Sequence, residues 1–95
     1  MKFEFELIMA LHGCNPDGTK FSLTAGDEVY LKLDWANMNL SFPDEWTNKY
    51  PDGWVKGQIR SISPTGQKIT FYVEPFTYFS LRHKNILEVS DKKPN

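Results

Sequence analysis

The sequence predicts a small all-β protein of one domain, built as an antiparallel barrel or sandwich. Apolar residues alternate with polar ones in several short segments, which is the period of a half-buried strand. Turn-forming Gly, Pro, Asn and Asp separate these segments. The chain has 95 residues, enough for one modest core. We therefore expect a single domain over residues 1–90 and a disordered polar tail over residues 91–95.

The first two strands are expected to form an N-terminal hairpin. Residues 3–12 alternate, and the apolar side of this strand holds Phe3, Phe5, Leu7, Met9 and Leu11. Residues 14–18 contain Pro16 and Gly18, which suit a reversing turn, so residues 19–23 can return as the partner strand. A second turn at residues 24–27 precedes a third strand, in which Val29, Leu31 and Leu33 share one side.

Residues 34–53 separate the third strand from the fourth, and this segment is too long for a structureless connection in a compact domain. Pro43 followed by Asp44 and Glu45 favours a helix start, because acids complement the positive end of the helix dipole. Pro51 ends the helix. We expect a short helical insertion near residues 43–50, with Phe42, Trp46 and Tyr50 along one face.

A second hairpin is expected from residues 54–62 and 69–74, which flank a Ser63-Pro64-Thr65-Gly66 turn. Val55 and Ile59 agree in parity but Ile62 does not, which predicts a bulge near Arg60 or Ser61. Residues 72–79 are expected to form a loop, residues 81–85 one helical turn, and residues 86–89 a closing strand.

From residue 20 to residue 90 the order of motifs resembles that of SH3-like barrels, including Tudor-type and small bacterial or phage proteins. The resemblance is carried by Gly26-Asp27-Glu28-Val29, by Trp54-Val55-Lys56-Gly57-Gln58-Ile59, and by the hairpin and closing strand that follow. It implies an SH3-like barrel of five to seven strands, to which the N-terminal hairpin and the helical insertion are additions. Function taken from so widely shared a shape is analogy.

Composition excludes several classes of protein. The formal charge of −1 argues against a chain that mainly grips phosphate backbones. Cys14 is the single cysteine and makes no internal disulfide, which fits a reducing compartment. No run approaches 20 apolar residues, and two acids interrupt the start of the chain, so we expect no membrane association and a cytoplasmic location.

The candidate partner-binding residues come from two aromatic-rich segments that an SH3-like barrel brings to one end. The chain has three Trp, four Tyr and seven Phe, more than a small core needs. Residues 34–53 are also locally acidic, so aromatic rings and carboxylates together suit a Lys or Arg of the partner. The candidates are Trp35, Trp46, Tyr50, Trp54, Tyr72, Phe76, Tyr78, Asp44 and Glu45. Individually, each ring is also a candidate for core packing.

A small basic patch provides the alternative, nucleic-acid binding, which so few charges would support only weakly. Its residues are Lys56, Arg60, Lys68, Arg82 and Lys84.

Catalysis and metal binding have little support in the sequence. His12 and Cys14 lie two apart, but zinc needs about four ligands and only His83 remains to join them. Residues 69–72 stand where plasmid-borne dihydrofolate reductases, which resemble SH3-like barrels, carry a Val-Gln-Ile-Tyr segment, but the Gln is missing. We expect no enzyme, no cofactor and no metal.

Three functions therefore stand as hypotheses. The first is a non-enzymatic binding protein that docks a Lys- or Arg-bearing protein surface, as a small inhibitor or adaptor. This includes a phage or mobile-element protein that blocks a host or defence factor. The second is nucleic-acid binding. The third is a homo-oligomer in which the same aromatics pair with one another.

Overall fold

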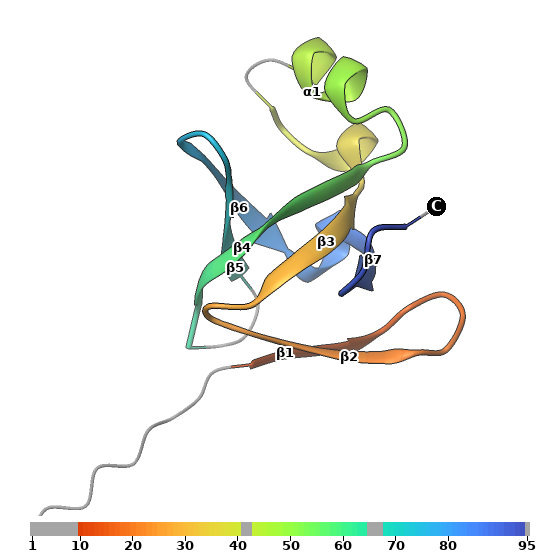
Figure 1. The fold of residues 1–95 in the computed structure, drawn as a ribbon, viewed down its shortest axis with the longest axis vertical. Helices are drawn as coiled ribbons and strands as arrows, with labels where there is room; N and C mark the ends of the chain where they lie inside the picture. The colour runs from red at the N-terminus through yellow and green to blue at the C-terminus, as the bar shows by residue number, and fades with distance from the viewer. Residues whose placement is uncertain (1–9, 41–42, 65–67, 95) are drawn as a thin grey trace, which may run out of the picture.

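The structure is a computed structural model that describes residues 10–40, 43–64 and 68–94. The elements run β1 (Ala10–Cys14), β2 (Lys20–Thr24), β3 (Glu28–Leu33), η1 (Trp35–Asn37), α1 (Pro43–Lys49), β4 (Trp54–Ile62), β5 (Lys68–Val73), β6 (Thr77–Arg82), η2 (His83–Asn85) and β7 (Ile86–Ser90). Figure 1 shows α1 and η1 at one end of the molecule and the β1–β2 hairpin across the other. The predicted all-β class with a short helical insertion is confirmed.

The strands form two antiparallel sheets. One is the β1–β2 hairpin, and the other has the order β6-β5-β4-β3-β7. The predicted closed barrel is wrong for the described chain, because β6 and β7 are opposite edges of an open sheet and do not pair. The closing strand β7 pairs with β3.

The core lies between the inner face of the larger sheet and the hairpin. Among the described residues, fourteen buried apolar side chains form it, and they come from every strand, with Leu11 and Leu23 contributed by the hairpin. In β5 the buried residues are Ile69, Phe71 and Val73, which share one parity as the sequence predicted. The alternation of the strands therefore decides which side chains remain on the outer face for contacts with other molecules.

Three local predictions for the second half of the chain can be compared with the structure. The register of β4 against β5 shifts between Ile59 and Ser61, so the predicted bulge lies at Arg60. The predicted loop over residues 72–79 is wrong, because Thr77–Arg82 is strand β6, with Phe79 and Leu81 buried on one side. The predicted helical turn is confirmed only over His83–Asn85. Residues 65–67 of the predicted turn lie outside the described residues.

The N-terminal hairpin is confirmed over its described part, whereas residues 3–9 of the predicted first strand lie outside it. Its turn places Asn15 against β7, 74 residues away in the chain. The Asn15 amide Nδ2 donates to the Val89 carbonyl at 2.9 Å, and its Oδ1 accepts from the Val89 N–H at 2.8 Å. One side chain thus supplies the donor and acceptor that a neighbouring strand would offer to the edge of β7.

We expect Asn15→Ala to lower the free energy of unfolding by about 1–3 kcal/mol, because Val89 then loses both partners at a partly covered edge. Asn15→Asp is the matched control, since it keeps the acceptor for the Val89 N–H and should lose only part of the effect. Urea unfolding followed by tryptophan fluorescence measures both. Equal stability of Asn15→Ala and the parent chain would contradict this role for the amide.

The insertion folds as predicted. Helix α1 begins at Pro43, carries Asp44 and Glu45 in its first turn and ends at Lys49. The preceding 3-10 turn, η1, follows β3 directly and brings Trp35 toward this helix. Among the described residues, no helix has the length and apolar character that crossing a bilayer requires.

Candidate functional site

The aromatic side chains of the insertion pack on one another and on β6. Trp46 stacks on Tyr50 with ring centroids 6.1 Å apart and planes 10° apart, and it meets Phe79 in a T-shaped contact with ring centroids 4.9 Å apart. Trp35 lies 6.4 Å from Trp46, and its Nε1–H donates to the Tyr50 carbonyl at 2.9 Å. All three insertion rings are half-buried against the core. Packing therefore occupies much of the surface that a partner was predicted to use.

Asp44 and Glu45, the predicted acidic partners of these rings, are exposed in the first turn of α1. There they complement the positive end of the helix dipole. Phe42, which was expected on the same helix face, lies outside the described residues. Docking of a Lys- or Arg-bearing surface here stays a prediction.

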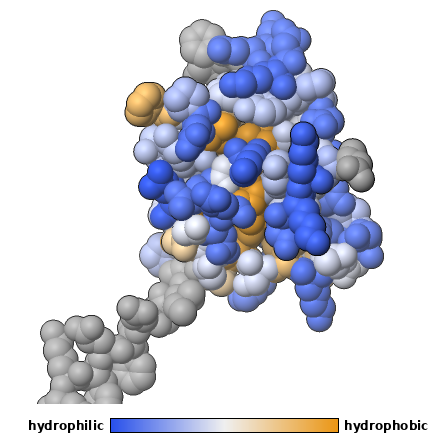
Figure 2. Space-filling model, in the orientation of Figure 1, coloured by the Kyte–Doolittle hydropathy of each residue, from blue (hydrophilic) through white to orange (hydrophobic). Residues whose placement is uncertain are grey.

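The β5–β6 hairpin carries the most exposed rings among the described residues. Phe76, in the turn between the strands, is 88% exposed, and Tyr78 is 61% exposed. Tyr78 lies 4.9 Å from Tyr72 between ring centroids, and the Arg60 guanidinium lies 4.5 Å from the centre of the Tyr72 ring. Figure 2 shows hydrophobic surface projecting beside the tip of this hairpin. The structure thus brings together three predicted residues with one from the predicted basic patch.

Trp54 does not join either group. It lies with Lys32 and Phe21 in a separate groove of about 770 Å³, between the hairpin turn and the β3–β7 part of the larger sheet. The expectation that all candidate aromatics meet at one end is therefore wrong for Trp54, because the alternation of β4 places it at the opposite groove.

The predicted basic residues lie on the outer face of the larger sheet or beside it. Lys56 and Arg60 are exposed on β4, and Lys56 approaches the Tyr30 ring at 6.0 Å. Lys68 of β5 and Arg82 of β6 are direct cross-strand partners, and Lys84 follows in η2. Two like charges in such a pair repel unless an anion lies close to them. Nucleic acid stays a prediction as the source of that anion.

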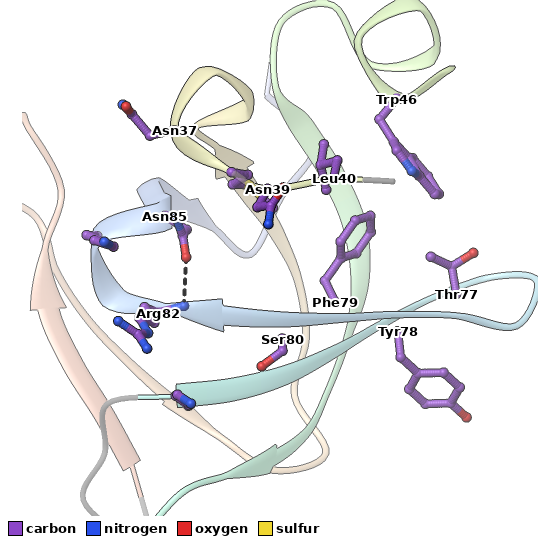
Figure 3. Close-up of a pocket in the computed structure, with 13 residues that line it drawn as sticks. Asn37, Asn39, Leu40, Trp46, Thr77, Tyr78, Phe79, Ser80, Arg82 and Asn85 are labelled. Carbon is purple, nitrogen blue, oxygen red and sulfur yellow. Dashed lines mark hydrogen bonds between the residues drawn. The ribbon is translucent and has the colours of Figure 1, made fainter. Parts of the chain in front are cut away.

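A groove of about 550 Å³ runs beside β6 and faces the segment from Asn37 to Leu40. Figure 3 shows Phe79 pointing toward Leu40 and Trp46, whereas Tyr78 and Ser80 point to the other side of β6. Lys68, Arg82 and Lys84 line the groove with them. The groove therefore has an apolar side and a basic side.

Sequence reasoning missed Phe79, Ser80 and Asn85 as groove residues, because it assigned this region to a loop or a turn. The signal was present: Phe79 and Leu81 alternate with Tyr78, Ser80 and Arg82 immediately after Pro75. Asn85 is buried, and its Oδ1 accepts from the Arg82 N–H at 2.9 Å.

Within the described ranges, no three His, Cys, Asp or Glu side chains gather as metal ligands. Cys14 is exposed in the hairpin. Asp17 has a lowered pKa, because its carboxylate accepts hydrogen bonds from Thr19, including one from the backbone N–H at 2.9 Å. These contacts stabilise a turn and form no catalytic arrangement.

Comparisons with protein-family models, with curated proteins and with solved structures found no match in any of the three.

Proposed function

We propose that this chain is a non-enzymatic binding protein that docks a protein partner through its β5–β6 hairpin. The anchors are Phe76 and Tyr78, with Tyr72 and Arg60 beside them. Hot spots of protein interfaces are enriched in aromatic residues and arginine, and this hairpin exposes aromatic rings next to an arginine. Covering a partner's surface is how a small inhibitor or adaptor acts, and we retain that role as part of the proposal.

Phe76 carries the proposal. Its φ of 62° lies in the left-handed region, which costs a residue with a Cβ about 1–2 kcal/mol. The ring is 88% exposed, so burial of the side chain offsets almost none of this strain. The Phe76 N–H donates to the Tyr72 hydroxyl at 3.3 Å, which helps to hold the turn. Backbone strain that is not offset by burial of the side chain is typical of residues at functional sites, where the side chain contacts another molecule.

The charge around these anchors favours an acidic partner surface. Arg60 covers one face of Tyr72, and Lys68 and Arg82 lie at the far end of the same hairpin. Together they outnumber Glu74, which is exposed in the turn, so this region is net positive. The acidic residues Asp44 and Glu45 lie instead on α1. A Lys- or Arg-bearing partner would meet α1 rather than the hairpin, so we prefer the acidic partner.

We also propose that the fold is an open relative of the SH3-like barrels. The supporting observation is the order of the larger sheet, in which the last strand, β7, returns beside the strand that opens the meander, β3. A shared fold of this kind does not identify the partner, because SH3-like barrels have many unrelated functions.

The proposal predicts that Phe76→Gly loses the partner while keeping or gaining stability. Glycine relieves the left-handed strain, so we expect a free energy of unfolding between that of the parent chain and about 1 kcal/mol above it. Affinity capture from native lysate should recover a protein with the parent chain and lose it with Phe76→Gly combined with Tyr78→Ala.

Leu87→Ala is the matched control, because Leu87 is another exposed large apolar side chain, 44% exposed, on the opposite edge strand β7. It should capture the same partner as the parent chain. Capture that survives loss of both hairpin rings would contradict the proposal, and so would a clear fall in stability on Phe76→Gly.

A further inference from the structure

Strand β6 is an edge of the larger sheet whose outward backbone groups have no strand beside them among the described residues. In an antiparallel ladder, residues that bond the neighbouring strand alternate with residues whose N–H and C=O point away. The Arg82 N–H points away, because it donates to the side chain of Asn85. The register between β5 and β6 is continuous, so the backbone groups of Ser80 and Tyr78 point the same way.

The opposite edge of the sheet is covered at Val89 of β7, where the Asn15 side chain bonds both the N–H and the C=O. At β6 the N–H of the last residue, Arg82, donates to the Asn85 side chain. Among the described residues, no strand faces the outward N–H and C=O of Tyr78 and Ser80, and both residues line the groove of about 550 Å³.

The two sides of the groove have different chemistry. On one side lie Phe79, Trp46 and Leu40. On the other lie Lys68 and Arg82, an unrelieved cross-strand pair of like charge, with Lys84 nearby. The lining, as far as the described residues form it, has three basic side chains and no acidic one. Successive side chains of an added strand would point alternately to these two sides.

We propose that the groove binds an extended segment of the partner protein, which adds to β6 as a further strand and alternates apolar with acidic residues. Its apolar side chains pack against Phe79 and Trp46, and its carboxylates face Lys68 and Arg82. Backbone bonds to Tyr78 and Ser80 give affinity, and the alternation gives specificity. This inference rests on the proposed function, because it states which part of the partner is recognised.

The test is a titration of the full chain with fluorescent peptides, read by anisotropy. The probe is a short peptide in which valine alternates with glutamate. Two controls accompany it: a valine–lysine peptide of the same length, and the valine–glutamate peptide with alternate backbone amides methylated. We expect saturable binding of the probe and at least tenfold weaker binding of both controls. Equal binding of the methylated peptide would overturn strand addition, and equal binding of the lysine peptide would overturn the charge preference.

A double variant of the protein tests the basic side of the groove. Lys68→Glu with Arg82→Glu should weaken binding of the glutamate peptide at least tenfold and strengthen binding of the lysine peptide, because the paired charges change sign. Both residues are exposed, and the reversed pair keeps the same mutual repulsion, so the variant should stay folded. A preference for glutamate that survives this reversal would overturn the assignment of the acidic side.

A second copy of the chain is the competing occupant, because residues 3–7 also alternate apolar residues with glutamate. Sedimentation of the full chain at two concentrations tests it. A dimer that Glu4→Lys with Glu6→Lys dissociates would overturn the proposal in favour of self-recognition. If partner capture depends on Phe76 but no peptide binds, the groove proposal is overturned and the proposed function stands. If the peptide binds but capture does not depend on Phe76, the proposed function is overturned and the groove remains a peptide-binding site.

Discussion

Trp46→Ala should lower the free energy of unfolding by about 3 kcal/mol. The indole stacks on Tyr50, lies 6.4 Å from Trp35 between ring centroids and makes a T-shaped contact with Phe79, so it joins α1 to η1 and to the sheet. Alanine would remove these contacts at once and leave the half-buried Trp35 without its neighbour. The insertion would lose most of what fastens it to β6.

Denaturant unfolding of the variant, followed by far-UV circular dichroism, measures the loss. Tyr78→Ala is the matched control, because Tyr78 is an aromatic residue of β6, beside Phe79, that is 61% exposed, and its loss should cost about 1 kcal/mol or less. If Trp46→Ala costs no more than Tyr78→Ala, the indole is free for a partner, as the sequence alone suggested.

The second large effect is expected at Gly57. A Cβ at this position would collide with the carbonyl oxygen of Tyr72 and would lie 2.7 Å from Cζ of Phe71. Phe71 is fully buried and the carbonyl belongs to the neighbouring strand, so neither can move away cheaply. We expect Gly57→Ala to lower the free energy of unfolding by about 3 kcal/mol, the upper part of the range for overpacking.

Gly18→Ala separates this steric effect from the loss of glycine's freedom. Gly18 has a φ of 89°, but nothing lies within 4 Å of its missing Cβ. The free energy of unfolding of that variant should therefore fall by about 1–2 kcal/mol, the cost of a left-handed backbone for a residue with a Cβ. Thermal unfolding of the two variants under one condition ranks them. A smaller loss for Gly57→Ala than for Gly18→Ala would show that the strands separate easily at this point.

The local parts of the fold were predictable because their causes are local. Pro43 with two following acids predicts where α1 begins, and Pro51 lies just beyond its end. The parity break after Ile59 predicts the bulge at Arg60. In each case the pattern and the structure are set within a few residues, so the sequence alone is sufficient.

The candidate site was less predictable, because it depends on contacts between distant residues. Trp46 and Tyr78 are both aromatic, but Trp46 packs on Phe79, whereas Tyr78 alternates with Phe79 along β6 and stays exposed. Strand β6 follows Pro75 and carries several aromatic residues, so its sequence fits an aromatic binding loop as well as an alternating strand. The closure of β7 by Asn15 links residues 74 positions apart, and no local pattern signals it.

The unequal edges of the larger sheet limit how the molecule can assemble. A filament built by edge pairing needs two free edges on every subunit, so that each copy binds one neighbour ahead and another behind. Here the Asn15 side chain occupies the outward N–H and C=O of Val89 on β7, whereas β6 is the other edge of the larger sheet. Within this sheet, strand pairing is therefore favoured at β6 over β7, so an added strand would extend the sheet in one direction.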